Sequence, residues 1–295
     1  MYSPFDEKLP AELMVQKLRQ LWDQRRLVYF HYPAQAKIRY GWGARPPHPQ
    51  LLNVIESYRR EITERLVTYV SLTGYLSEIP REANDTRPYW KNTLLPVIDA
   101  VSIVGVIKEF KPRKFIEVGS GNSTRFAKFA TSKFAPQCKV TSIDAYPGDT
   151  IRALPDEMIS KGLQDIDLDL FQRLEPGDVV WVDGSHFAYA NSDVAVFAMD
   201  VLPRLPPGVV IGVHDIPLPW DYPPGMCELL FSELPVISSY LLGAKDRVEV
   251  LLPCLFANHI DPQLKAITQP LRTMPATVGL KELDGGGAFW FRMKH

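Results

Sequence analysis

The sequence is poor in cysteine and has no long apolar run. Its three cysteines, Cys138, Cys227 and Cys254, are odd in number and far apart. This spacing matches neither a disulfide framework nor a zinc site, so we predict reduced thiols in a cytoplasmic protein. No apolar run approaches the ~20 residues that a membrane-spanning helix needs. The stretch 1–10 carries charges and prolines and has no apolar signal core.

A surplus of charge of either sign is also missing. The chain has 33 basic and 34 acidic residues and a formal net charge of -1. Balanced charge provides no overall attraction to nucleic acid or to an anionic membrane. We therefore expect neither as a partner.

The 295 residues can bury a large core, as one domain with an added segment or as two domains. Apolar spacing and composition predict a helix over 10–30, a loop over 32–49 and an amphipathic helix over 51–76. A polar stretch with two prolines follows, and we place a domain boundary there. The predicted organisation is an N-terminal helical and loop extension, 1–90, and a main domain, 91–295. The apolar face of the second helix is typical of contact with a neighbouring domain or a second subunit, which would make a homo-oligomer.

The most informative stretch begins at residue 113. A short apolar run over 115–118 ends at Gly119, and Gly121 follows. Ser123 or Thr124 can cap a helix that continues with apolar residues. A strand, a Gly-x-Gly turn and a helix are the opening of a nucleotide-binding α/β unit. The two glycines allow a sharp turn and let a ligand lie against the backbone.

Two details separate this turn from the dinucleotide-binding fingerprint. Thr124 stands where the fingerprint needs a third small residue. Glu117 lies two residues before the first glycine, where a carboxylate would repel a pyrophosphate. The same carboxylate suits a ligand with an amino group and a positive charge, such as S-adenosylmethionine. A nicotinamide-dependent oxidoreductase stays open as the alternative.

Polar residues follow three further predicted strands. Asp144 ends the strand over 139–143, about 25 residues after the glycines, where a ribose needs a carboxylate. Other predicted strands run directly into Asp183-Gly-Ser-His186 and into His214-Asp215. Because ligands collect at the carboxyl ends of parallel strands, we expect these residues to share one edge of the sheet.

The remaining predicted elements complete an α/β sheet. We predict a helix over 149–161 and an antiparallel strand pair from 247–256 and 288–293. The segment 163–170 is either a weak third strand or a plain loop.

Taken together, the motifs Glu117-Val-Gly-Ser-Gly-Asn-Ser-Thr124, Ser142-Ile-Asp144, Val182-Asp-Gly-Ser-His186 and Val213-His-Asp-Ile-Pro217 resemble one family. It is the class I S-adenosylmethionine-dependent methyltransferases, in the branch with Asp-x-x-His and His-Asp motifs that is similar to macrocin-type sugar O-methyltransferases. The resemblance covers residues 90–258. It implies a doubly wound, mostly parallel, seven-stranded, Rossmann-like sheet, with the N-terminal helical extension left unexplained.

The resemblance also implies roles for individual residues. His186 corresponds to a candidate general base, and His214 stands where magnesium-dependent relatives place an acid. Magnesium prefers oxygen ligands, so the site could hold magnesium, another divalent metal or none. The metal ligands would be Asp183 and Asp215, and the catalytic residues His186, Asp183 and His214. For His214, orienting Asp215 is the alternative to a direct role. The cofactor-binding residues would be Glu117 at the amino group, Asp144 at the ribose, and Gly119, Ser120, Gly121, Asn122, Ser123 and Asp183.

The predicted function is therefore S-adenosylmethionine-dependent methylation of a hydroxyl on a small-molecule or glycan acceptor. A sugar hydroxyl is a poor nucleophile at neutral pH, so a base or a Lewis acid must assist. A non-catalytic protein that keeps the methyltransferase fold is a further alternative. The sequence leaves the acceptor and the oligomeric state open, since fold-level resemblance says little about substrate.

Overall fold

The computed structural model describes residues 10–24, 31–32, 34–43, 45–83 and 86–294. They belong to two compact units, Met1–Lys37 and Ile38–His295. The described helix of the first unit is α1 (Ala11–Asp23), whose Leu13, Val15 and Trp22 are each about half exposed. The predicted helix over 10–30 is thus present in its first part, and 25–30 lie outside the described residues.

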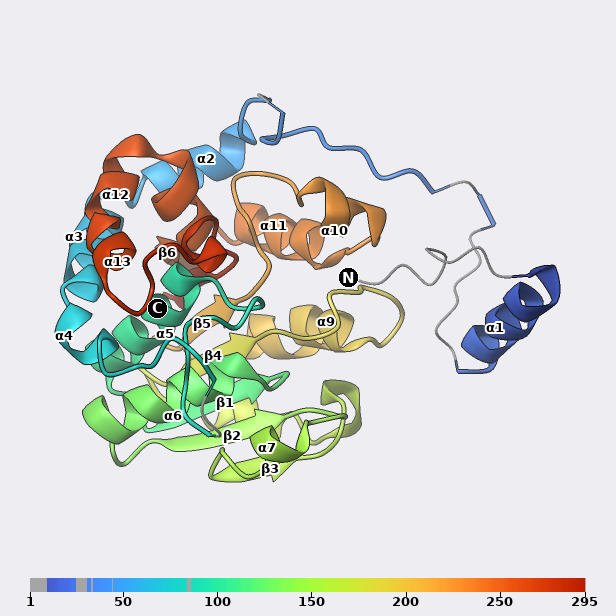
Figure 1. The fold of residues 1–295 in the computed structure, drawn as a ribbon, viewed down its shortest axis with the longest axis horizontal. Helices are drawn as coiled ribbons and strands as arrows, with labels where there is room; N and C mark the ends of the chain where they lie inside the picture. The colour runs from blue at the N-terminus through green and yellow to red at the C-terminus, as the bar shows by residue number, and fades with distance from the viewer. Residues whose placement is uncertain (1–9, 25–30, 33, 44, 84–85, 295) are drawn as a thin grey trace. The chain divides into compact units, whose positions relative to one another are not determined.

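The second unit is built on one sheet. Its described residues form seven strands in the order β3-β2-β1-β4-β5-β7-β6 (Figure 1). The first five are parallel, and β7 runs antiparallel to both β5 and β6. The strands are β1 (Lys114–Val118), β2 (Lys139–Ile143), β3 (Glu157–Ile159), β4 (Val179–Val182), β5 (Val210–Val213), β6 (Val248–Pro253) and β7 (Phe289–Met293). This arrangement confirms the predicted fold class, including the antiparallel pair at the edge.

The central strands are buried over nearly their whole length, as expected for parallel strands covered on both faces. Gly212 in β5 makes room for two large aromatic side chains. A Cβ there would lie 2.6 Å from the Trp290 ring and 2.7 Å from the Trp181 ring, and the two indoles pack with centroids 5.1 Å apart. A larger residue at this position would force the centre of the core apart.

Short and long helices surround this sheet. Within the described residues of the second unit, the α-helices are α2 (Pro49–Glu56), α3 (Arg59–Val70), α4 (Thr73–Leu76), α5 (Val97–Phe110), α6 (Asn122–Phe134), α7 (Asp149–Arg152), α8 (Asp169–Gln172), α9 (Asp193–Val196), α10 (Pro224–Glu228), α11 (Glu233–Gly243), α12 (Pro262–Ile267) and α13 (Gln269–Thr273). We find among them no helix with the length and apolar character required to cross a lipid bilayer.

The single helix predicted over 51–76 is three helices, α2, α3 and α4. The chain turns at Tyr58, whose hydroxyl donates to the Val248 carbonyl of β6 at 3.0 Å. Arg65 of α3 pairs with Glu109 of α5 and donates to the Leu251 carbonyl, and Figure 1 shows α3 beside α12. These helices share the core of the sheet. The division between the two units, after Lys37, therefore does not coincide with the boundary predicted near residue 90.

The third strand is wrongly placed in the sequence prediction. β3 lies at 157–159 and pairs with β2, while the segment 163–170 contains short helical turns instead. The helix predicted over 149–161 ends at Arg152, because a proline at 155 disfavours helical geometry before it. Asp156 then accepts from the Val140 amide of β2 at 2.8 Å and from Lys128 at 2.7 Å, which aligns β3 with its neighbour.

Candidate functional site

The glycine turn, residues 119–121, lies directly against the end of β4. Gly119 has a φ of +81°, in the left-handed region that favours glycine. A Cβ on it would lie 1.9 Å from the Asp183 carbonyl oxygen. Glycine is therefore required here twice, by conformation and by contact, and the turn brings Asp183 beside the start of α6.

Gly121 has the opposite surroundings. A Cβ on it would meet no atom within 4 Å, so the space above this residue is open. It is the N-cap of α6, and its amide donates to the Thr124 hydroxyl at 3.0 Å. The predicted cap at Ser123 or Thr124 is thus wrong by two or three residues. An open backbone at a helix N-terminus can accept a ligand lying flat against it.

Glu117 is enclosed beneath the turn. Its carboxylate accepts from the hydroxyls of Ser123 at 2.5 Å, Thr124 at 2.6 Å and Ser142 at 2.8 Å. Burial raises the pKa of this carboxyl to about 7, although the three hydroxyls act to lower it. The side chain has no exposed surface, so the predicted direct contact with a ligand's amino group does not fit. Glu117 instead fixes the turn from below.

Asp144 connects the glycine turn to the end of β2. Its Oδ2 accepts from the Ser120 amide at 3.0 Å and from the Ser120 hydroxyl at 2.6 Å. Its Oδ1 accepts from the Tyr146 amide at 2.8 Å. The residue is partly exposed, so the carboxylate lies beside the open backbone of the turn, where the sequence analysis expected it.

The acid–imidazole cluster comprises Asp183, His186, His214 and Asp215, from the ends of β4 and β5. One donor atom each from Asp183, His186 and Asp215 lie within 4.8 Å of one another. The His186 Nε2 is 3.7 Å from Asp183 Oδ1 and 3.5 Å from Asp215 Oδ2. Two carboxylates and one imidazole form a donor set that divalent transition metals accept.

His214 lies beneath this group. Its Nδ1 is 3.4 Å from Asp183 Oδ1 and 3.6 Å from Asp215 Oδ1. Burial acts to lower the pKa of the ring, but the two carboxylates outweigh it and raise that pKa well above its usual value. His214 in turn keeps the pKa of Asp183 low against the effect of burial. With its side chain only 4 % exposed, His214 cannot reach an acceptor, so the predicted catalytic role becomes one of holding the two acids.

Two buried acids of the site are missing from the sequence analysis. Asp99 of α5 lies 3.2 Å from His214 Nε2 and accepts from the Gly287 amide at 2.7 Å. Glu233, at the start of α11, lies 2.9 Å from His186 Nδ1. Both are fully buried. The available signal was an acid followed by apolar residues in the first turn of each helix, which a hydrophobic-periodicity search passes over.

The loop before α2 is attached to the segment that follows β5. Asp221 accepts from the Arg39 amide at 2.6 Å and the Tyr40 amide at 3.0 Å, and its carbonyl accepts from the Trp42 indole at 2.7 Å. Part of the N-terminal segment is thereby attached to the chain that carries Asp215.

A seven-stranded, mostly parallel sheet with an antiparallel β7 and a glycine turn after β1 is the Rossmann-like fold of class I methyltransferases. Residues 116–216, roughly a third of the chain, match the family described as a methyltransferase domain. This match confirms the resemblance to class I S-adenosylmethionine-dependent methyltransferases inferred from the motifs. The matched range contains the ends of β1, β2, β4 and β5.

The chain also matches individual proteins. An uncharacterised protein of Archaeoglobus fulgidus is 30% identical over 118 residues, which are 38% of this chain and 53% of the relative, so the chain spans about half the length of that relative.

Among solved structures, the methyltransferase PaMTH1 of Podospora anserina, bound to SAH, is 12% identical, with a TM-score of 0.37 and coverage of 99% of this chain and 100% of the other. An O-methyltransferase from Bacillus cereus with SAH is 15% identical, with a TM-score of 0.37 and coverage of 86% and 94%. The MycE methyltransferase of mycinamycin biosynthesis, with Mg, SAH and mycinamycin VI, is 15% identical, with a TM-score of 0.36 and coverage of 64% and 47%.

Proposed function

We propose that this protein is an S-adenosylmethionine-dependent methyltransferase that methylates a hydroxyl group of a small-molecule or glycan acceptor. The observation that supports this most strongly is the contact between Gly119 and the Asp183 carbonyl. The glycine turn after β1 thereby lies against the end of β4, which supports a cofactor site beside a proton-accepting group.

The cofactor side fits S-adenosylmethionine better than a dinucleotide. The open backbone at Gly121 would accept the methionine part, while Asp144 would accept from the ribose hydroxyls. When bound, this cofactor supplies a methyl group on a positively charged sulfur. The neighbouring carboxylate of Asp183 favours a cation and disfavours a pyrophosphate. This argues against the nicotinamide alternative.

The acceptor side can take up the proton that the hydroxyl must lose. His186 presents Nε2 toward two carboxylates, which stabilise the imidazolium that forms. Burial acts to lower the pKa of His186, but Glu233, Asp215 and Asp183 outweigh it and raise that pKa above 6.5. The ring therefore loses its proton only above this ordinary value, and we expect turnover to rise as the pH increases through the raised pKa of His186.

The same residues also favour a divalent cation as a component of the site. Asp183 and Asp215 would hold it with carboxylate oxygens, and the nearby His186 nitrogen favours a transition metal such as Fe²⁺ or Zn²⁺ over Mg²⁺. A cation there would act as a Lewis acid toward the acceptor hydroxyl.

Calorimetry with S-adenosylmethionine and with NADH tests the proposal. We expect S-adenosylmethionine to bind and NADH not to bind. Incubation with methyl-labelled S-adenosylmethionine and a panel of sugars and phenols should then release S-adenosylhomocysteine. Preferential binding of NADH would indicate an oxidoreductase, and cofactor binding without product for any acceptor would indicate a non-catalytic protein.

A further inference from the structure

We infer that Glu233 is a positioning residue that holds His186 with its proton on Nδ1 and leaves Nε2 free to face Asp183 and Asp215. The inference deepens the proposed function and rests on the role given there to His186. It concerns the orientation and tautomer of the ring, and it applies whether Nε2 accepts a proton or binds a cation.

The contact between Glu233 and His186 determines which nitrogen carries the proton. Glu233 Oε2 lies 2.9 Å from His186 Nδ1, and the carboxylate is fully buried. An ionised carboxylate has no proton to donate and can only accept a hydrogen bond, so the imidazole nitrogen opposite it is the donor. The shared proton therefore belongs to Nδ1, and the carboxylate accepts it. In the neutral ring, Nε2 then carries the lone pair.

The residues next to Glu233 hold the rest of His186. The Phe231 ring stacks on the imidazole, with centroids 4.8 Å apart and an interplanar angle of 29°. The Ser232 amide donates to the His186 carbonyl at 2.9 Å, and the Ser232 hydroxyl accepts from the Ala188 amide at 2.8 Å. Three consecutive residues thus hold the face, the backbone and one nitrogen of a single histidine.

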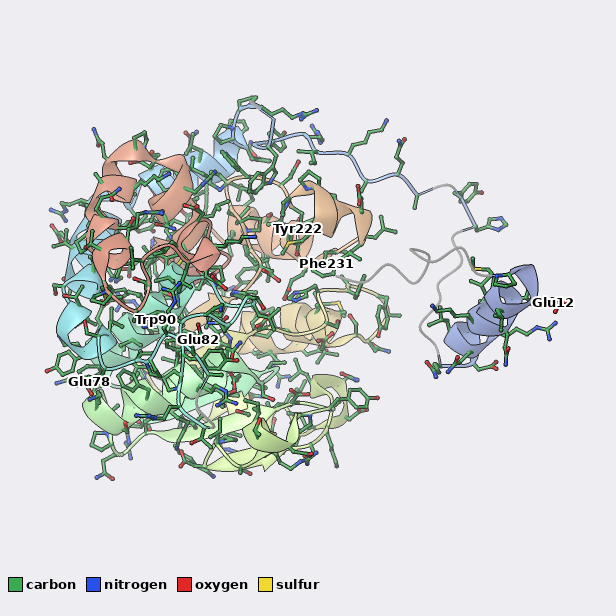
Figure 2. The ribbon with its side chains drawn as sticks, in the orientation of Figure 1. Glu12, Glu78, Glu82, Trp90, Tyr222 and Phe231 are labelled. Carbon is green, nitrogen blue, oxygen red and sulfur yellow. The ribbon has the colours of Figure 1, made fainter. Side chains whose placement is uncertain are left out.

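This support matters because His186 is in an uncommon backbone conformation. Its φ is +63°, in the left-handed region that non-glycine residues rarely adopt. Such a conformation persists where the surroundings hold it. Tyr222, labelled with Phe231 in Figure 2, packs against Phe231 and so supports the ring that stacks on His186. Its ring lies 5.8 Å from that of Phe231, and its hydroxyl accepts from the Leu234 amide at 3.1 Å.

Because Nδ1 is bound to Glu233, the orientation of the ring is fixed and Nε2 can point in only one direction. Nε2 lies 3.7 Å from Asp183 Oδ1 and 3.5 Å from Asp215 Oδ2. A flipped ring would exchange the two nitrogens and lose the contact with Glu233. The buried carboxylate therefore selects the one ring orientation in which the basic nitrogen faces Asp183 and Asp215.

Nitrogen-15 NMR of protein labelled in its histidine rings tests the inference directly. At alkaline pH, where the rings are neutral, we expect the His186 signal, identified by its absence in His186→Asn, to show a protonated Nδ1. In Glu233→Leu the ring should lose this preference and give the signature of Nε2 protonation or of exchange. The matched control, Glu228→Gln, changes an exposed acid five residues earlier and should leave the signal unchanged.

The results separate this inference from the proposed function. A protonated Nε2 in the wild-type protein overturns the inference without any variant, as does an unchanged tautomer in folded Glu233→Leu. Calorimetry with S-adenosylmethionine on the same samples tests the cofactor assignment independently. Unaltered affinity in Glu233→Leu together with a changed tautomer supports the inference, and failure of the wild-type protein to bind the cofactor counts against the proposed function alone.

Discussion

On the β1–β2 side of the site, the carboxylates of Glu117 and Asp144 are held by hydroxyl groups and backbone amides. On the β4–β5 side, Asp183 and Asp215 lie among the rings of two histidines. The first side is assembled from neutral donors, which lie between 2 and 25 residues from the acids they bind. The second side brings together acids and imidazoles from four separate elements, namely α5, α11 and the ends of β4 and β5.

The neutral donors on the first side and the buried ion pairs on the second have different physical consequences. Neutral donors do not require a charged partner to stay in place, so the glycine turn can be rigid before any ligand arrives. Buried ion pairs gain most when every member is present, and removal of one member leaves another charge uncompensated. We therefore expect changes on the first side to alter cofactor binding and stability, and changes on the second to alter turnover together with stability.

The largest effect should come from His186→Ala. Loss of the base should lower turnover about 100- to 10,000-fold while the affinity for S-adenosylmethionine stays unchanged, because the ring lies on the acceptor side. Release of S-adenosylhomocysteine with an acceptor from the panel, and calorimetry, measure the two quantities. His31→Ala, in the first unit, is the control. Full turnover in His186→Ala would remove the base from the mechanism.

Replacing the two glycines of the turn separates fold from ligand binding. Gly119→Ala should lower the free energy of unfolding by about 3 kcal/mol or more, since left-handed geometry costs about 1–2 kcal/mol and the clash with the Asp183 carbonyl adds strain. Urea unfolding measures this loss.

Gly121→Ala is the matched change in open space. Its stability should stay within about 1 kcal/mol of the wild type, while the affinity for S-adenosylmethionine falls, because the new methyl group occupies the surface above the turn. Equal stability of the two alanine variants would contradict the geometry described for the turn.

Glu117→Gln tests whether the Glu117 carboxyl, on the first side, has a raised pKa in the folded protein. The pKa of Glu117 rises from 4.5 to about 7 on folding. Its contribution to stability is complete below pH 4.5 and is lost as the pH rises through about 7, a change of about 3 kcal/mol.

The glutamine variant cannot ionise and should not show this loss. Urea unfolding at acidic and alkaline pH should show the variant gaining on the wild type as the pH rises, whereas Glu228→Gln should not gain. An advantage that is the same at both pH values would indicate that Glu117 is ionised in the folded protein.

The smallest expected effect is that of Asp144→Asn. The amide oxygen can still accept from Ser120, but the negative charge near the ribose is lost, so the affinity for S-adenosylmethionine should fall about 10-fold. Asp149→Asn, an exposed acid in α7, serves as the control. Calorimetry that finds the same affinity in Asp144→Asn as in the wild type would exclude Asp144 from the ribose role.

Local patterns were enough to predict the strand–turn–helix at Gly119, the apolar central strands, and the placement of Asp144, Asp183 and Asp215 at strand ends. These features depend on nearby residues and on parallel strands ending at a common edge. Three other features could not be predicted in this way: the enclosure of Glu117 by three hydroxyls, the contacts of Asp99 and Glu233 with the two histidines, and the pairing of β3 at 157–159. The reason is that these outcomes depend on contacts between segments far apart in the chain, where one buried partner outweighs the local preference that a sequence pattern expresses.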